Sequence, residues 1–172
     1  MFDRTMRSPG APLVPEGNAM LSNMGPAAYA NRPDVPDLTL HGLARIVPLR
    51  AAPGYHLDPE SPDARGMTVI GGDKLAAGTV VDIWVDRAEP SPRYYEVQVT
   101  GLSHTVLLPF TCTRIRARAN QVMVKSILAS QFAQVPAIAS PDRVTLLEED
   151  RIMAYYSSGY LYATPDRQEP HF

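Results

Sequence analysis

The sequence predicts a mainly β domain with one C-terminal helix and an extended, Pro-rich N-terminal arm. Apolar and polar residues alternate over residues 78–99, GTVVDIWVDRAEPSPRYYEVQV, which predicts two antiparallel strands because side chains alternate between the faces of a strand. Thr145 and Glu148 form a capping box ahead of an apolar run, which predicts a helix over 146–158 that Gly159 ends. The 17 prolines among 172 residues favour extended segments over a helical bundle.

The arm, residues 1–37, contains six prolines and no sustained hydrophobic period. Proline interrupts helices and central strands, so we expect neither here. The arm holds more apolar residues than a linker needs, and we therefore expect it to pack on partner subunits rather than to remain a floppy tail. We expect one folded domain over 38–165 and a frayed tail over 166–172.

The first half of the domain is predicted to contain strands at 38–49 and 67–70, separated by a Pro- and Gly-rich loop at 52–66. The central hairpin follows. Its strands are joined by a predicted loop at 87–93, because Pro90 and Pro92 cannot donate to a ladder.

The second half is predicted to contain a strand at 105–110, a hairpin of 114–118 with 121–125, and a short turn within 128–135. Three arginines share one face of the first hairpin strand: Arg114, Arg116 and Arg118. This face is either solvated or a docking surface for carboxylates or lipid phosphates, which guanidinium groups bind in a forked geometry.

Composition and motifs exclude several functions. A net charge of −2 gives no reason to expect nucleic-acid binding, and the single Cys112 excludes an internal disulfide. No run approaches the ~18 apolar residues that span a bilayer, and the N-terminus lacks a signal-peptide core. There is no Gly-rich phosphate loop, no nucleophile turn and no metal-ligand spacing, so we expect a protein that is not an enzyme and holds no metal.

Asp86, Glu89 and Arg93 are expected to cluster at one end of the central hairpin. From the residues alone, this cluster is a solvated loop with a surface ion pair worth about 0–1 kcal/mol.

Four segments in order, GTVVDIWVD, YYEVQV, TVLLPF and SPDRVTLLEED, resemble the cytoplasmic domain of the H subunit of purple-bacterial type photosynthetic reaction centres. The resemblance covers residues 11–165 and implies a PRC barrel, a small antiparallel β-barrel. Members of the family usually begin with a transmembrane helix, which this sequence lacks. We expect the anchor to be a separate transmembrane polypeptide, although a truncated chain would look the same.

The resemblance implies a non-catalytic structural subunit at the cytoplasmic face of the photosynthetic membrane. Such a subunit caps the L and M subunits below the secondary quinone, and antenna proteins are further candidate partners. Bacteriochlorophyll, bacteriopheophytin and quinones would be bound by partner subunits and none by this chain alone.

Glu89 occupies the place of an acid on the family's proton route to the secondary quinone, and Asp86 and Arg93 also match the family pattern. Burial raises the pKa of a carboxyl and a nearby cation lowers it, so both together can poise it for proton transfer. His41 matches one member of a surface Asp/His/His cluster at the proton entry. The other two places hold Thr39 and Leu43, so we expect no metal site.

Two alternatives stay open. One is a free-standing PRC-barrel adaptor of the RNA-processing type, against which the long apolar arm argues. The other is a small hydrolase that uses Asp82, Asp86 and a histidine, which no spacing in the sequence favours.

Overall fold

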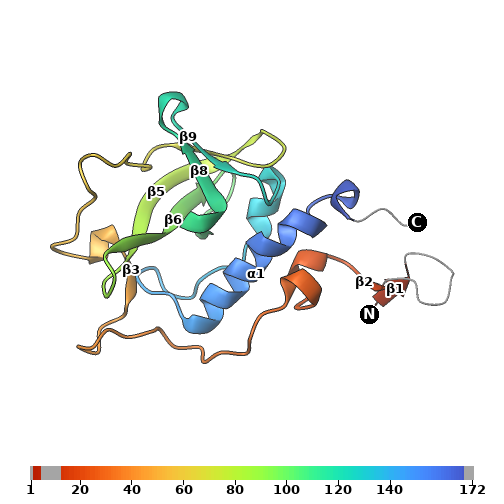
Figure 1. The fold of residues 1–172 in the computed structure, drawn as a ribbon, viewed down its shortest axis with the longest axis horizontal. Helices are drawn as coiled ribbons and strands as arrows, with labels where there is room; N and C mark the ends of the chain where they lie inside the picture. The colour runs from red at the N-terminus through yellow and green to blue at the C-terminus, as the bar shows by residue number, and fades with distance from the viewer. Residues whose placement is uncertain (1, 5–12, 169–172) are drawn as a thin grey trace.

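The computed structural model describes residues 2–4 and 13–168, and its centre is a seven-stranded sheet (Figure 1). The sheet order is β7-β6-β5-β4-β9-β8, and β3 pairs with β5 beside this path. The strands of the sheet are β3 (Ile46–Pro48), β4 (Thr68–Ile70), β5 (Ala76–Asp86), β6 (Ser91–Val99), β7 (Thr105–Pro109), β8 (Thr113–Arg116) and β9 (Gln121–Val124). A separate two-stranded sheet pairs β1 (Phe2–Arg4) with β2 (Leu13–Pro15).

Over residues 2–4 and 13–168, one α-helix accompanies these sheets, α1 (Leu146–Tyr162), together with several short 3-10 helices. These are η1 (Ala19–Leu21), η2 (Gly25–Ala27), η3 (Leu49–Ala51), η4 (Phe110–Cys112), η5 (Ala117–Ala119), η6 (Ala129–Gln134) and η7 (Pro165–Arg167). None of the helices in the described ranges is both long enough and apolar enough to cross a bilayer. The mainly β class with one long C-terminal helix is therefore confirmed.

The PRC-barrel-like sheet that we expected is present, but within the described residues it does not close into a barrel and one of its pairs is parallel. The sheet has two ends, β7 and β8, and β4 pairs with β9 in parallel. β7 and β8 follow each other along the chain and are joined by the 3-10 turn η4, but they do not pair with each other in the described residues. The sheet thus curves without closing, and β8 is left as an edge strand.

The central hairpin forms where the alternation predicted it, with two irregularities in its register. β5 carries one extra residue between the pairs Val80↔Val97 and Asp82↔Glu96, so Val81 bulges out and is exposed. The loop is shorter than predicted, because β6 begins at Ser91 and includes Pro92. A second register shift lies next to Pro92, where a missing N–H donor is tolerated.

The strand predicted over 38–49 is much shorter, because only β3 pairs with β5 and the residues before it form a turn. In that turn the N–H of Thr39 donates to the carbonyl of Leu43 over 2.8 Å. Pairing of β3 with the end of β5 sets Ile46 opposite Asp86. This register places Arg45, the residue before β3, beside the end of β5.

The capping box of α1 is confirmed, since Thr145 and Glu148 each accept the other's backbone N–H. The predicted stop at Gly159 is wrong, and the helix continues to Tyr162. A Cβ atom at Gly159 would collide with the carbonyl oxygen of Ser126 and the side chain of Ile127. Glycine is therefore needed there for close approach of the helix to the neighbouring chain and not for a left-handed cap.

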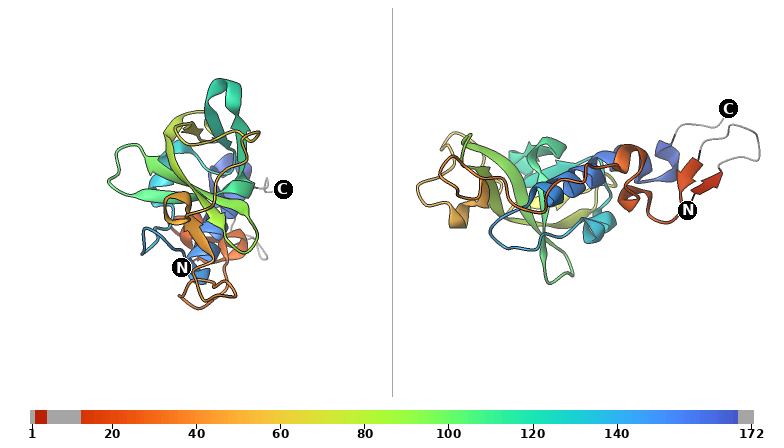
Figure 2. Two further views of the ribbon diagram at one scale, coloured as in Figure 1. Left: turned by 90° about the vertical axis from the view of Figure 1, so that its left-hand side faces the viewer. Right: turned by 90° about the horizontal axis from the view of Figure 1, so that it is seen from below.

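The arm packs on α1 of its own chain through η1 and η2, whereas β1 and β2 lie to one side of this contact (Figures 1 and 2). Met20 is only 3% exposed and belongs to the hydrophobic core. Arg32 forms an ion pair with Asp150 at 3.5 Å, and the Arg151 guanidinium lies 5.6 Å from the centre of the Tyr29 ring. The arm is consequently part of the domain, and its packing on partner subunits stays a prediction.

Two predicted segments lie partly outside the described ranges. Residues 1 and 5–12 of the arm and residues 169–172 of the tail are not described. The described beginning of the tail is not frayed, because Arg167 donates to the carbonyl oxygens of Ser126 and Gly159. These hydrogen bonds tie η7 to the segment that follows β9 and to α1.

Candidate functional site

The candidate site lies where β3 meets the end of β5, around the carboxylate of Asp86. Arg45, the residue before β3, donates from Nε to both oxygens of Asp86 at 2.9 Å, and its Nη2 lies 2.8 Å from Oδ2. The side chain of Asp86 is 0% exposed, so its charge needs these donors. Arg93 lies farther away, with Nη1 3.7 Å from Oδ2.

Asp86 also closes the turn that follows β5. Its Oδ1 accepts the backbone N–H of Ala88 at 2.9 Å and that of Glu89 at 3.2 Å. Burial by itself would raise the pKa of Asp86, but the hydrogen bonds from Arg45 and from the two backbone N–H groups outweigh it and lower that pKa below its ordinary value. Asp86 is therefore a fixed negative charge near neutral pH.

Glu89 lies at the outer side of the same cluster. Its side chain is 75% exposed and its Oε1 lies 3.7 Å from Nη2 of Arg45. The structure thus brings Asp86, Glu89 and Arg93 together, as the sequence indicated, but around Arg45, which the sequence analysis did not single out. We expected both burial and a nearby cation to prepare Glu89 for proton transfer. Arg45 is the nearby cation, but this chain does not bury Glu89.

A cleft of about 330 Å³ extends from this cluster to the first turn of α1, and Arg32, Asp37, Arg45, Asp86, Arg93, Tyr94, Glu149 and Asp150 are among its lining residues. The hydroxyl of Tyr94 donates to Oε1 of Glu149 at 2.8 Å. Burial raises the pKa of Glu149, and Tyr94 and the cations Arg93 and Arg32 only partly offset that effect. Glu149 is thus an acid of the site that the sequence did not single out.

His41 is exposed at the tip of the turn that precedes β3. No hydrogen bond or ion pair joins it to another residue of the described chain, and no group of metal-ligating side chains occurs among residues 2–4 and 13–168. Its proposed role in proton entry therefore stays a prediction.

The three arginines Arg114, Arg116 and Arg118 are exposed, the first two on β8 and the third on η5. The hairpin of β8 and β9 projects from the top of Figure 1, whereas β3 and the start of α1 lie at the lower side. The structure therefore keeps these arginines apart from the cleft.

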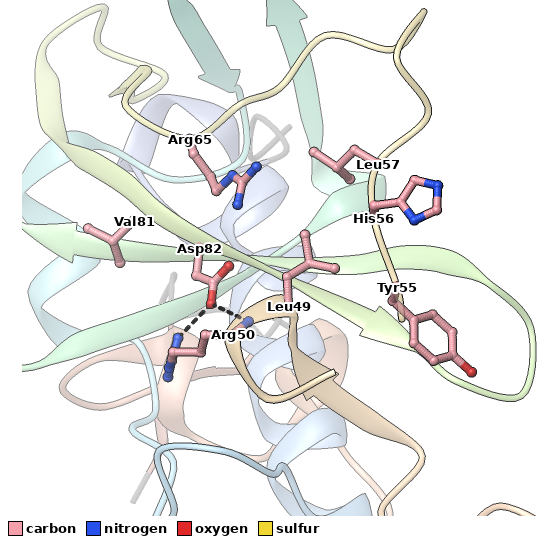
Figure 3. Close-up of a pocket in the computed structure, with 8 residues that line it drawn as sticks. All are labelled: Leu49, Arg50, Tyr55, His56, Leu57, Arg65, Val81 and Asp82. Atoms are coloured by element: carbon pink, nitrogen blue, oxygen red, sulfur yellow. Dashed lines mark hydrogen bonds and ion pairs between the residues drawn. The ribbon is translucent and has the colours of Figure 1, made fainter. Parts of the chain in front are cut away.

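A second arginine–carboxylate cluster lies four residues earlier on β5, beside a pocket of about 580 Å³ (Figure 3). Nη1 of Arg50 lies 2.9 Å from Oδ2 of Asp82 and 2.5 Å from Oε2 of Glu96. The indole N–H of Trp84 also donates to Oε2 of Glu96, at 2.9 Å. Asp82 and Asp86 thus bind different arginines in separate clusters, which removes the geometric basis for a hydrolase that uses both.

Comparison with protein families gives two consecutive matches. Residues 1–51 match the family described as photosynthetic reaction centre, H-chain N-terminal region, and residues 60–131 match the PRC-barrel domain. Arg45 and His41 lie in the first match, and Asp86, Glu89 and Arg93 lie in the second. The chain therefore belongs to the H-subunit type of photosynthetic reaction-centre proteins and contains their PRC-barrel domain.

Proposed function

We propose that this reaction-centre subunit caps the cytoplasmic ends of the L and M subunits and passes protons through its cleft towards the reduced secondary quinone. The observation that carries the proposal is the link between an exposed and a buried carboxylate. Glu89 lies 3.7 Å from Arg45, which in turn holds the fully buried Asp86 at 2.8 Å. The match to the H-chain N-terminal region supports a reaction-centre subunit over a free-standing PRC-barrel adaptor.

The three acids of the site would have different roles. Asp86, with its lowered pKa, stays ionised and positions Arg45. Glu89, exposed beside Arg45, would accept protons from water. Glu149, whose pKa burial raises, can hold a proton at a higher pH than an ordinary glutamate, and its bond with Tyr94 orients it in the cleft. A proton passing inward would thus meet an exposed acid first and a partly buried acid next.

Such a role makes the chain a non-catalytic part of an electron-transfer complex. Bacteriochlorophyll, bacteriopheophytin and quinones would be held by the partner subunits. Peripheral attachment at the cytoplasmic face, a separate transmembrane anchor polypeptide and contacts with antenna proteins belong to the same proposal.

The test is the variant Glu89→Gln in the assembled reaction centre, because glutamine keeps the shape and the hydrogen bonding of glutamate but cannot titrate. Flash-induced absorbance changes separate the two electron transfers to the secondary quinone. We expect the second, proton-coupled transfer to slow and the first to change less. Glu60→Gln, an exposed glutamate in the loop before β4, is the matched control. Equal second-transfer rates in Glu89→Gln and the wild type would remove Glu89 from the proton route.

A further inference from the structure

The hairpin of β8, η5 and β9, residues 113–124, carries three cations that form no ion pair with any residue of the described ranges. The ion pairs found within the described ranges use arginines elsewhere, namely Arg32, Arg45, Arg50, Arg65 and Arg93. Arg114, Arg116 and Arg118 are all exposed. This hairpin is thus a local basic surface on a chain whose net charge is −2.

β8 is also the last strand of the sheet. It pairs on one side only, with β9, from Thr113↔Val124 to Arg116↔Gln121. Backbone N–H and C=O groups alternate in direction along a strand, so half of those on β8 point to an edge that no described strand covers. Arg114 and Arg116, two residues apart, stand on one face of this edge at a spacing of about 7 Å.

Charged residues on an edge strand usually prevent pairing with another copy of the same protein. Arginines achieve this against a second basic edge, since like charges directly opposite each other repel. They have the opposite effect on a strand with acidic side chains, because opposite charges in cross-strand positions attract. The edge of β8 therefore selects its occupant by charge.

We propose that β8 binds an extended acidic segment of a partner protein, which adds to the sheet as a further strand. Backbone hydrogen bonds along the edge would supply the pairing, and carboxylates of the segment would lie opposite Arg114 and Arg116. Arg118 lies on η5, beyond the end of β8, and contributes only long-range attraction.

The position of the hairpin favours a protein over a membrane as the occupant. The hairpin projects from the side of the sheet away from the arm and from the start of α1, as the views of Figures 1 and 2 agree. This step rests on the proposed function, which turns the cleft towards the membrane-embedded subunits and so turns β8 away from the bilayer.

The probe for this proposal is a fluorescein-labelled peptide, Thr-Glu-Val-Glu-Val-Glu-Thr, titrated with the full 172-residue chain and followed by fluorescence anisotropy. A second peptide with proline in place of both valines keeps the charge but cannot pair as a strand. Arg114→Gln with Arg116→Gln is the test variant. Lys74→Gln with Arg143→Gln removes the same charge from exposed positions elsewhere and is the control.

We expect the test variant to bind the first peptide about tenfold more weakly than the wild type, and the control variant to bind it within about twofold. The proline peptide should bind at least about fivefold more weakly, and amide hydrogen exchange of β8 should slow only with the first peptide. Equal binding of the two peptides, or equal binding by the two variants, would overturn strand addition at β8.

Vesicles of phosphatidylglycerol provide the membrane arm of the test. The proposal would be overturned if vesicle binding depends on the arginines while the peptide does not slow amide hydrogen exchange of β8. The hairpin would then be assigned to a lipid surface. These measurements use the isolated chain and need no electron transfer. If Glu89→Gln leaves the rate of the second electron transfer unchanged, proton relay through Glu89 is refuted, but the peptide experiment can still be interpreted.

Discussion

β3 and β5 build two arginine–aspartate pairs that differ in what surrounds them. Arg45 precedes β3 and binds Asp86 at the end of β5, while Arg50 follows β3 and binds Asp82 in the middle of the same strand. The antiparallel register of β3 and β5 places both pairs, since Ile46 lies opposite Asp86 and Pro48 lies opposite Trp84. The two pairs therefore share chemistry and strands.

The two pairs differ in the groups that surround them. The Arg50 cluster ties three parts of the chain together, because Glu96 also accepts from Trp84 and Thr105, and Nη2 of Arg50 donates to the carbonyl of Pro141. The Arg45 cluster opens into the cleft and carries the exposed Glu89. Both clusters line a hollow of the surface, but the further donors around Glu96 make the Arg50 cluster a clamp, whereas the Arg45 cluster carries an acid that is 75% exposed to water.

The largest effect should come from breaking the clamp with Arg50→Met. This change leaves the buried carboxylates of Asp82 and Glu96 without a cation, which should destabilise the fold by about 3 kcal/mol. Urea unfolding followed by the fluorescence of Trp84, the only tryptophan, measures it. Arg143→Met, at an exposed position, should change stability by less than about 0.5 kcal/mol. Equal losses in both variants would mean that the Arg50 cluster is no clamp.

Asp86→Asn should cost less, about 2 kcal/mol near pH 7, because asparagine keeps part of the hydrogen bonding of Asp86 but loses the ion pair with Arg45. The pKa of Asp86 is lowered in the fold, so its contribution is present above the unfolded value of about 3.9 and is lost as the pH falls through the folded value. Unfolding free energies of wild type and variant should therefore draw together as the pH falls below about 3.9. A difference that does not depend on pH would contradict the lowered pKa.

Glu149→Gln should have a small effect of the opposite sign. The pKa of Glu149 is raised in the fold, so ionisation there opposes folding once the pH rises above the unfolded value of about 4.3. The variant should be more stable than the wild type near pH 7, by about 0.5 kcal/mol, and equally stable near pH 4. Thermal unfolding at the two pH values checks this, and a destabilised variant at neutral pH would show that the carboxylate is needed ionised.

The smallest effect on stability is expected for Glu89→Gln. Its side chain is 75% exposed and its contact with Arg45 is long, so unfolding free energy should change by less than about 0.5 kcal/mol at any pH. Circular dichroism during urea unfolding measures this. A loss of more than about 1 kcal/mol would make Glu89 part of the folding core of the cluster and would weaken its assignment to proton transfer.

Features that depend on neighbouring residues were predictable. The alternation over 78–99 predicted the β5–β6 hairpin, and the spacing of Thr145 and Glu148 predicted the start of α1. The turn after β5 was predictable as a meeting place of Asp86, Glu89 and Arg93, because all three lie within eight consecutive positions. Pro92 was predicted in the loop but lies in β6. A register shift beside it accommodates a residue without an N–H.

Features that depend on distant segments were missed. Arg45 lies 41 residues from Asp86, and its only local signal was a charge inside an apolar stretch. Glu149 lies in the first turn of a helix, where the helix dipole by itself favours an acidic residue, and its contact with Tyr94 spans 55 residues. Gly159 had the local signature of a helix stop, whereas its role is close contact with Ser126 on another segment.

Short-range periodicity and ordered motifs were enough to establish the mainly β class, the central hairpin, the helix start and the family to which the chain belongs. The folded structure was needed to show that the described sheet stays open at β8, that Arg45 holds Asp86, and that Glu149 faces the same cleft. These outcomes follow from strand register and helix packing. Both bring together groups that are far apart along the chain, and burial then sets the pKa of each group.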